Sequence, residues 1–166
     1  MQGLFIGILV LVLLSVFYSD RNFRLVYLWQ LLTVFASSLS LAILHWGWKI
    51  SGMILLNNVL FSALLLLLTF LFLRVRKKEL PFWDHAFGKG DLLFFLAIAP
   101  LFLPQVFMIF VLLGLLTGMT IGIIQKQKQS GVPLAGIMAL LLCGVLLFEL
   151  MLNISIRFTT YTFAGL

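Results

Sequence analysis

Charged residues are scarce in this chain of 166 residues. Asp, Glu, Lys and Arg together make up 10% of it, whereas about 25% is usual for a soluble domain. Apolar residues make up 63%, and a chain of this length cannot enclose so much apolar surface in one water-exposed fold. The composition also excludes intrinsic disorder, which requires low hydrophobicity. We therefore expect the chain to use lipid as its solvent.

Cysteine and ligand-binding motifs are also lacking. The single cysteine, Cys143, allows neither an internal disulfide nor a zinc cluster, and its apolar surroundings are typical of a small buried side chain. No phosphate-binding loop, dinucleotide fingerprint or nucleic-acid-binding motif is present. We expect no metal, no cofactor and no nucleic-acid partner. The net charge of +6 is interpreted as a signal of membrane orientation.

Long apolar runs are abundant. A membrane-spanning helix needs roughly 20 apolar residues, and six candidate spans follow one another at residues 3–19, 25–44, 51–73, 91–103, 105–124 and 133–152. No cation precedes the first run, so we interpret it as a span and not as a cleaved signal peptide. The runs are continuous and not alternating, which argues against a transmembrane barrel. The sequence predicts an all-α polytopic membrane protein with about six transmembrane helices and one domain, residues 1–166.

The fourth candidate span is short and contains prolines. Pro100 and Pro104 interrupt it, and proline kinks or ends a helix because it lacks a backbone N–H donor. We interpret Leu103-Pro104-Gln105 as a tight turn that joins the fourth and fifth spans. The alternative is one long kinked span, which leaves five crossings.

Cations are concentrated in alternate connections. Nine of the eleven Lys and Arg residues lie between spans one and two, three and four, or five and six; the exceptions are Lys49 and Arg157. Cytoplasmic loops of membrane proteins carry the excess of Lys and Arg. This pattern predicts that both termini lie outside the cytoplasm.

Among only five acidic residues, two stand at the borders of apolar runs. Asp20 follows the first run and Asp91 opens the fourth, roughly 70 positions later. The predicted orientation puts both at the cytoplasmic membrane boundary. An ionisable group bordering hydrocarbon is costly and is therefore a candidate functional group. Capping of a helix N-terminus explains Asp91 but not Asp20, which stands at the opposite end of its helix.

Two carboxylates held close together share a proton, because ionising both is costly. Aspartic proteases use such a pair: one carboxylate takes a proton from water, which attacks a peptide carbonyl, and the other stabilises the oxyanion. Gly88, Lys89 and Gly90 precede Asp91 and form a G-x-G-D motif. The glycines give the backbone clearance that an extended substrate chain needs.

These motifs resemble those of the type IV prepilin peptidases and their preflagellin-peptidase relatives, which are GxGD aspartic proteases. Residues 17–24 (Phe-Tyr-Ser-Asp-Arg-Asn-Phe-Arg) resemble the family's first-aspartate segment. Residues 87–93 (Phe-Gly-Lys-Gly-Asp-Leu-Leu) resemble the second. Residues 132–136 resemble a proline-containing segment that follows a basic loop, which suggests a site-adjacent loop at Pro133 and Gly136.

The resemblance implies that Asp20 and Asp91 form a catalytic dyad in the bacterial inner membrane. It implies a prepilin or pseudopilin substrate with a short basic leader and a hydrophobic helix, cleaved on the cytoplasmic side. Glu79 and Asp84 are candidate contacts for the basic leader. Many family members carry an N-terminal region with paired CxxC motifs and a methyltransferase activity; with a single cysteine, we expect neither here.

Two other function classes remain open at this point. A small proton- or ion-coupled transporter would use the two aspartates to bind ions, and a noncatalytic assembly factor of the same fold would need neither aspartate.

One pair of polar residues and one series of small residues have structural interpretations. Asn57 and Asn58 are expected to hydrogen-bond to a neighbouring helix. Gly114, Gly118 and Gly122 recur at a four-residue spacing that favours close helix packing.

Overall fold

Helices account for almost all of the chain that can be described. The computed structural model describes residues 2–75, 89–124 and 134–152. Within these ranges it is 94% helical and has no strand, so the predicted all-α fold is confirmed there. The elements are α1 (Gln2–Phe23), α2 (Leu28–Trp46), α3 (Trp48–Val75), α5 (Lys89–Ile98), the short 3-10 helix η1 (Ala99–Leu101), α6 (Pro104–Ile124) and α7 (Leu134–Leu152).

Five of these helices are long and apolar enough to cross a membrane: α1, α2, α3, α6 and α7. The fourth predicted span is shorter, since α5 and η1 together form an apolar stretch of only Gly90–Leu101. α5 and α6 are nevertheless separate, because η1 and two non-helical residues intervene before Pro104 begins α6. The two segments are therefore separate helices and not one long kinked helix.

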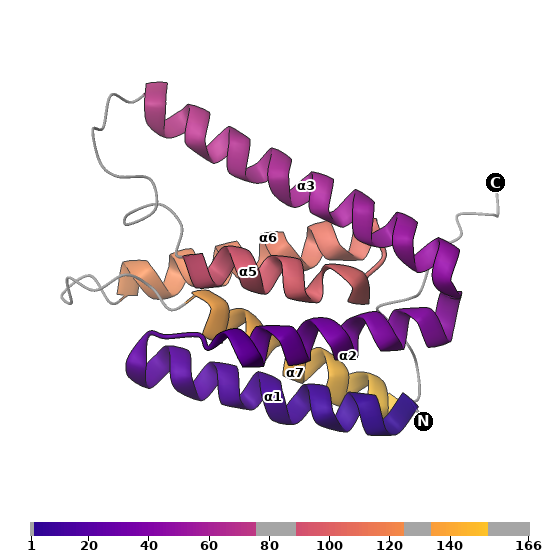
Figure 1. Cartoon of the computed structure of the whole chain (residues 1–166). Coiled ribbons are helices and arrows are strands. Elements are labelled where there is room, and N and C mark those ends of the chain that lie inside the picture. Colours follow the sequence, from indigo (N-terminus) through magenta and orange to yellow (C-terminus); the bar gives the residue numbers. More distant parts are fainter. Residues whose placement is uncertain (1, 76–88, 125–133, 153–166) are drawn as a thin grey trace.

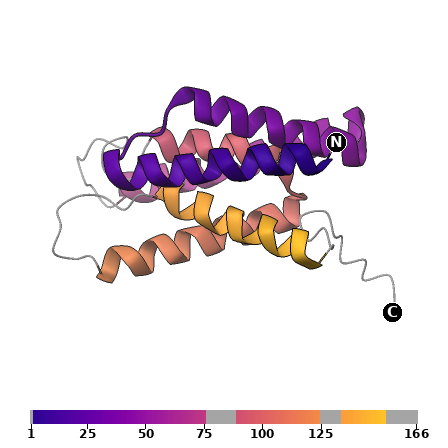
Figure 2. The same ribbon diagram turned by 90° about the horizontal axis from the view of Figure 1, so that it is seen from below.

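Successive helices run in opposite directions (Figure 1). The chain begins at the end of the bundle where α7 stops, and α2, α5 and α7 begin at the other end. α1 packs against α2 and α7, and α2 also packs against α5. Figure 2, the view from below, shows α1 lying along α2 on one side and α7 crossing beside α6.

Two turns join α1, α2 and α3. Arg24 directly follows α1 and has a positive φ of 55°. Its backbone N–H donates to the carbonyl of Asp20 at 3.1 Å. Gly47 alone joins α2 to α3, with a φ of 77°. That conformation is costly for a residue with a Cβ, which explains glycine at this position.

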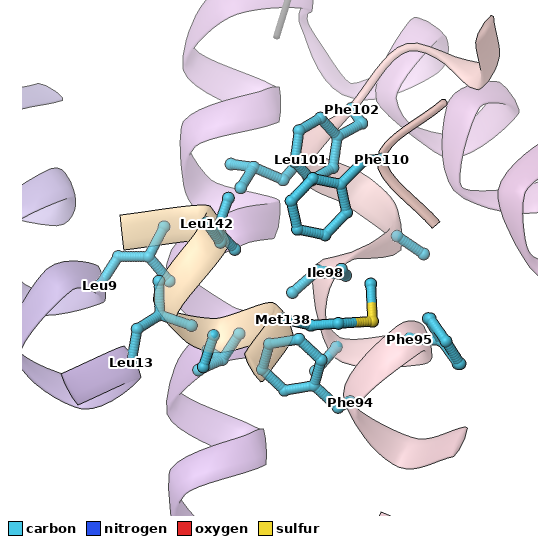
Figure 3. Close-up of a cluster of buried hydrophobic side chains, with 14 of the residues drawn as sticks. Leu9, Leu13, Phe94, Phe95, Ile98, Leu101, Phe102, Phe110, Met138 and Leu142 are labelled. Atoms are coloured by element: carbon cyan, nitrogen blue, oxygen red, sulfur yellow. The ribbon is translucent and has the colours of Figure 1, made fainter. Parts of the chain in front are cut away.

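The core lies between α1, α2, α5, α6 and α7, and part of it is drawn in Figure 3. Leu9 and Leu13 of α1 lie beside Leu142 of α7, whereas the Met138 side chain points toward Gly114 of α6, and the aromatic rings of α5 and α6 pack nearby. Phe102 stacks on Phe110 with 4.9 Å between ring centroids. Such dense packing fixes the relative positions of the helices on which the candidate site depends.

The α6–α7 contact depends on small residues. A Cβ built on Gly114 would lie 2.8 Å from the Met138 side chain, and one on Gly118 would lie 2.7 Å from Leu134. The predicted role of these two glycines in close helix packing is confirmed. The side-chain surroundings of Gly122 fall outside the part of the chain that can be described.

Candidate active site

Asp20 lies in the last turn of α1 and not beyond it. The helix continues to Phe23, past the predicted end of the first run at Ser19. The Asp20 side chain is buried, with 7% of its surface exposed. A carboxylate in such a position requires hydrogen-bond donors, because burial without them is costly.

Asp91 lies in the first turn of α5 and is partly exposed. This agrees with the expectation that its carboxylate stands at a helix N-terminus. Lys89 is the first residue of α5. A Cβ built on Gly90 would lie 3.4 Å from the Val26 side chain, so the connection between α1 and α2 reaches the start of α5.

The first turn of α7 brings the two aspartates together. The backbone N–H of Gly136 donates to Oδ2 of Asp20 at 2.5 Å. The backbone N–H of the preceding residue, Ala135, donates to Oδ1 of Asp91 at 2.8 Å. Three covalent bonds separate these two nitrogens, which limits the distance between the two carboxylate oxygens to about 10 Å at most. Two residues remote in the chain therefore share one helix terminus.

The physical basis of this arrangement is the unsatisfied N-terminus of α7. The first four N–H groups of an α-helix have no partner within the helix, and the helix dipole attracts negative charge there. Each aspartate satisfies one of these donors. The same contacts hold each carboxylate in place at the border of the apolar core.

At one end of the bundle α1 stops and α5 and α7 begin. We call this end the aspartate end.

Gly136 makes the close approach of Asp20 possible. A Cβ at this position would lie 2.9 Å from Asp20 Oδ2 and 3.2 Å from Asp20 Cβ. Sequence analysis placed Gly136 in a site-adjacent loop. That interpretation is wrong in its local structure, because Gly136 is the third residue of α7, but the residue does lie at the aspartates.

A buried amide next to Asp20 was missed by sequence analysis. Gln30 of α2, 1% exposed, accepts from the Ser19 hydroxyl at 3.2 Å and from the Tyr27 backbone N–H at 3.1 Å. Its own Nε2 donates to the Ser15 hydroxyl at 2.8 Å. These bonds tie the last turns of α1 to the first turn of α2. Gln30 thus supports the segment that carries Asp20. The sequence feature that could have identified Gln30 is its position as a lone amide within an apolar run.

Four of the predicted site residues lie outside the described residues: Glu79, Asp84, Gly88 and Pro133. The structure therefore brings together Asp20, Asp91 and Gly136, with Gly90 beside Asp91. Within residues 2–75, 89–124 and 134–152, no group of three His, Cys, Asp or Glu side chains is arranged to hold a metal ion. Cys143 is buried with its sulfur 3.8 Å from the carbonyl of Val10, which confirms the structural interpretation of that residue.

Comparisons with protein-family models, with curated proteins and with solved structures found no match for this chain.

Proposed function

We propose that the chain is a membrane aspartic endopeptidase whose catalytic dyad is Asp20 and Asp91. The observation that carries the proposal is the pair of hydrogen bonds from Gly136 and Ala135, because they hold the two carboxylates at adjacent backbone nitrogens. The resemblance of residues 17–24 and 87–93 to the prepilin peptidase motifs supports the same pair.

In this reaction one carboxylate takes a proton from a water molecule as the water oxygen bonds to the carbonyl carbon of the scissile peptide. The other carboxyl group, protonated, donates a hydrogen bond to the developing oxyanion. The tetrahedral intermediate then collapses: the C–N bond breaks, and the amine leaves with a proton supplied by the dyad. The role of α7 is to hold the two carboxylates in position, which reduces the reorganisation needed during the reaction.

The proposal places the chain in a bacterial inner membrane with six crossings and both termini outside the cytoplasm. The apolar stretch of α5 and η1 is then the fourth crossing, shorter than the others and packed against α2, α3 and α7. Exposed Arg21, Arg24 and Arg74 lie at the aspartate end, and the positive-inside rule assigns that end to the cytoplasm. Cleavage takes place at this boundary.

The proposed substrate is a prepilin or pseudopilin with a short basic leader ahead of an apolar helix. Glu79 and Asp84, both in the segment between α3 and α5, are proposed as carboxylates that attract the leader. The reaction needs water and the two aspartates, and the proposal includes no metal and no other cofactor.

The test is to replace Asp20→Asn and Asp91→Asn singly and to measure cleavage of a reconstituted type IV prepilin by the size shift of its product. Each asparagine keeps an acceptor for α7 but cannot take part in proton transfer. We expect each variant to lose cleavage by about a hundredfold or more. Glu149→Gln is the matched control, because Glu149 is also a buried acid on a membrane-spanning helix but lies at the far end of α7. Cleavage that survives either aspartate change contradicts the dyad.

A further inference from the structure

An apolar cleft lies between α3 and α5, on a different side of α5 from α7. It has a volume of about 190 Å³ and is lined by Leu92, Phe95 and Leu96 of α5, by Val111 of α6, and by six residues of α3: Val59, Phe61, Ser62, Ala63, Leu65 and Leu66. Leu92 directly follows Asp91. The cleft therefore begins within one residue of the candidate dyad and extends along α5 into the apolar part of the bundle.

The cleft begins next to Asn58, where α3 is fixed to η1. The side-chain amide of Asn58 donates to the carbonyls of Ala99 and Phe102, at 2.7 and 2.8 Å, and fixes α3 to η1. Beyond this point α3 diverges from α5 toward the aspartate end (Figure 1). The separation between the two helices therefore increases from η1 toward the aspartate end (Figure 1).

The lining restricts what can occupy the cleft. Among its described residues only Ser62 has a polar side chain, and the Ser62 hydroxyl donates to the Asn58 carbonyl within α3 at 2.9 Å. A peptide occupant must therefore arrive with its own backbone hydrogen bonds satisfied, which in a membrane means an α-helix. Phe61 and Phe95 offer aromatic surface for an apolar side chain of such a helix.

We propose that this cleft, which we call the α3–α5 cleft, seats the apolar transmembrane helix of the peptide substrate. The inference rests on the proposed function, since it is the position of Asp91 next to the cleft that selects a substrate helix over a lipid chain. A helix seated along α5 ends at the first turn of α5, so the chain that precedes it reaches the N-terminus of α5, where Asp91 lies. The cleft thus selects substrates by an apolar helix, and the dyad cuts beside it.

The first test fills the cleft. Ala63 lines it and has an exposed side chain, so Ala63→Trp adds an indole ring to the space without changing the core. Ala36→Trp, at an exposed position of α2 outside the cleft, is the matched control. Both are reconstituted with a type IV prepilin in phosphatidylethanolamine–phosphatidylglycerol vesicles. We expect Ala63→Trp to slow cleavage at least tenfold, mainly through KM, and Ala36→Trp to cleave at the unmodified rate.

The second test does not depend on cleavage. Leu66, which also lines the cleft, is replaced by the photo-cross-linking residue p-benzoylphenylalanine in the Asp20→Asn background, and the same prepilin is added. The inference requires a cross-link to the apolar helix of the prepilin. Cross-links to lipid alone, or equal cleavage by the two tryptophan variants, overturn it while leaving the dyad standing. If the unmodified chain does not cleave prepilin, the proposed function fails and the Leu66 cross-link still decides whether the cleft binds this helix.

Discussion

Gly136 is the residue on which the meeting of α1 and α7 most directly depends. Asp20 Oδ2 lies so close to this glycine that a methyl group at Gly136 would be 2.9 Å from it. The contact is with the side chain that we propose as catalytic and not with a flexible apolar tip. A small change at this position therefore acts on the geometry of the dyad.

We predict that Gly136→Ala lowers the cleavage rate by about a hundredfold, because a displacement of about 1 Å in a catalytic group has effects of this size. We expect no comparable loss in the stability of α7, since alanine is more favourable than glycine inside a helix by roughly 0.5–1 kcal/mol. The measurements are cleavage of a reconstituted prepilin and thermal unfolding in detergent. Gly144→Ala is the control, because a Cβ at Gly144 meets nothing within 4 Å; equal rates for the two variants would contradict the argument.

The two aspartates were predictable from the sequence, and their partners on α7 were not. An acidic side chain at the border of an apolar run is rare enough to be conspicuous, so Asp20 and Asp91 are visible in the sequence. The donors from Ala135 and Gly136 are backbone N–H groups, which every residue except proline carries. Only the packing of α1 and α5 against α7 determines which N–H groups meet the carboxylates.

At the scale of single elements, the joint between α3 and η1 depends on one of two adjacent asparagines. Both were expected to bond to a neighbouring helix. Asn58 is fully buried and donates to two carbonyls at the break between α5 and α6, whereas Asn57 is exposed. Adjacent residues on a helix point about 100° apart, so sequence position alone did not show which one faces η1.

The difference in burial between Asn58 and Asn57 provides a matched pair of variants. We expect Asn58→Leu to lower the free energy of unfolding by about 2 kcal/mol, because it leaves the carbonyls of Ala99 and Phe102 without their donor in an apolar environment. Part of the loss is offset, since Asn58 Oδ1 is itself buried without a hydrogen-bond partner. Asn57→Leu should change stability by less than about 0.5 kcal/mol. Unfolding of both variants in mixed micelles measures the difference, and equal stabilities would show that the joint is not held by Asn58.

The positions of the helices followed from the sequence more closely than their ends. The length and apolarity of the runs predicted each of the five long helices, because a membrane-spanning segment must form its backbone hydrogen bonds within itself. α1 and α3 extend beyond the predicted limits, to Phe23 and Val75, since polar residues at a membrane border remain compatible with helix. A break near Pro100 and Pro104 was predicted, because a proline has no N–H to continue the helix, but the predicted turn at residues 103–105 is displaced: the non-helical residues are 102 and 103, and Pro104 begins α6.

At the scale of the whole molecule, alternation of helix direction and the distribution of charge agree with one orientation. The described helices bring the ends of α1, α3 and α6 to the aspartate end (Figure 1), where Arg21, Arg24 and Arg74 are exposed. Lys49 lies at the opposite end, in the first turn of α3. The divergence of α3 from α5 beside the α3–α5 cleft was not predictable, because it leaves no periodic pattern in the sequence.

The orientation itself is open to measurement with single cysteines in a Cys143→Ala background. We expect Lys49→Cys to react with a membrane-impermeant maleimide added outside intact spheroplasts, because its end of α3 faces away from the cytoplasm in the proposed topology. Arg21→Cys, exposed on α1, should react only after the membrane is permeabilised. The Cys143→Ala parent, which has no thiol, gives the background signal. Labelling of Arg21→Cys in intact spheroplasts would place both aspartates outside the cytoplasm, where a cytoplasmic leader cannot reach them. That result would exclude the proposed site of cleavage even if the dyad geometry is correct.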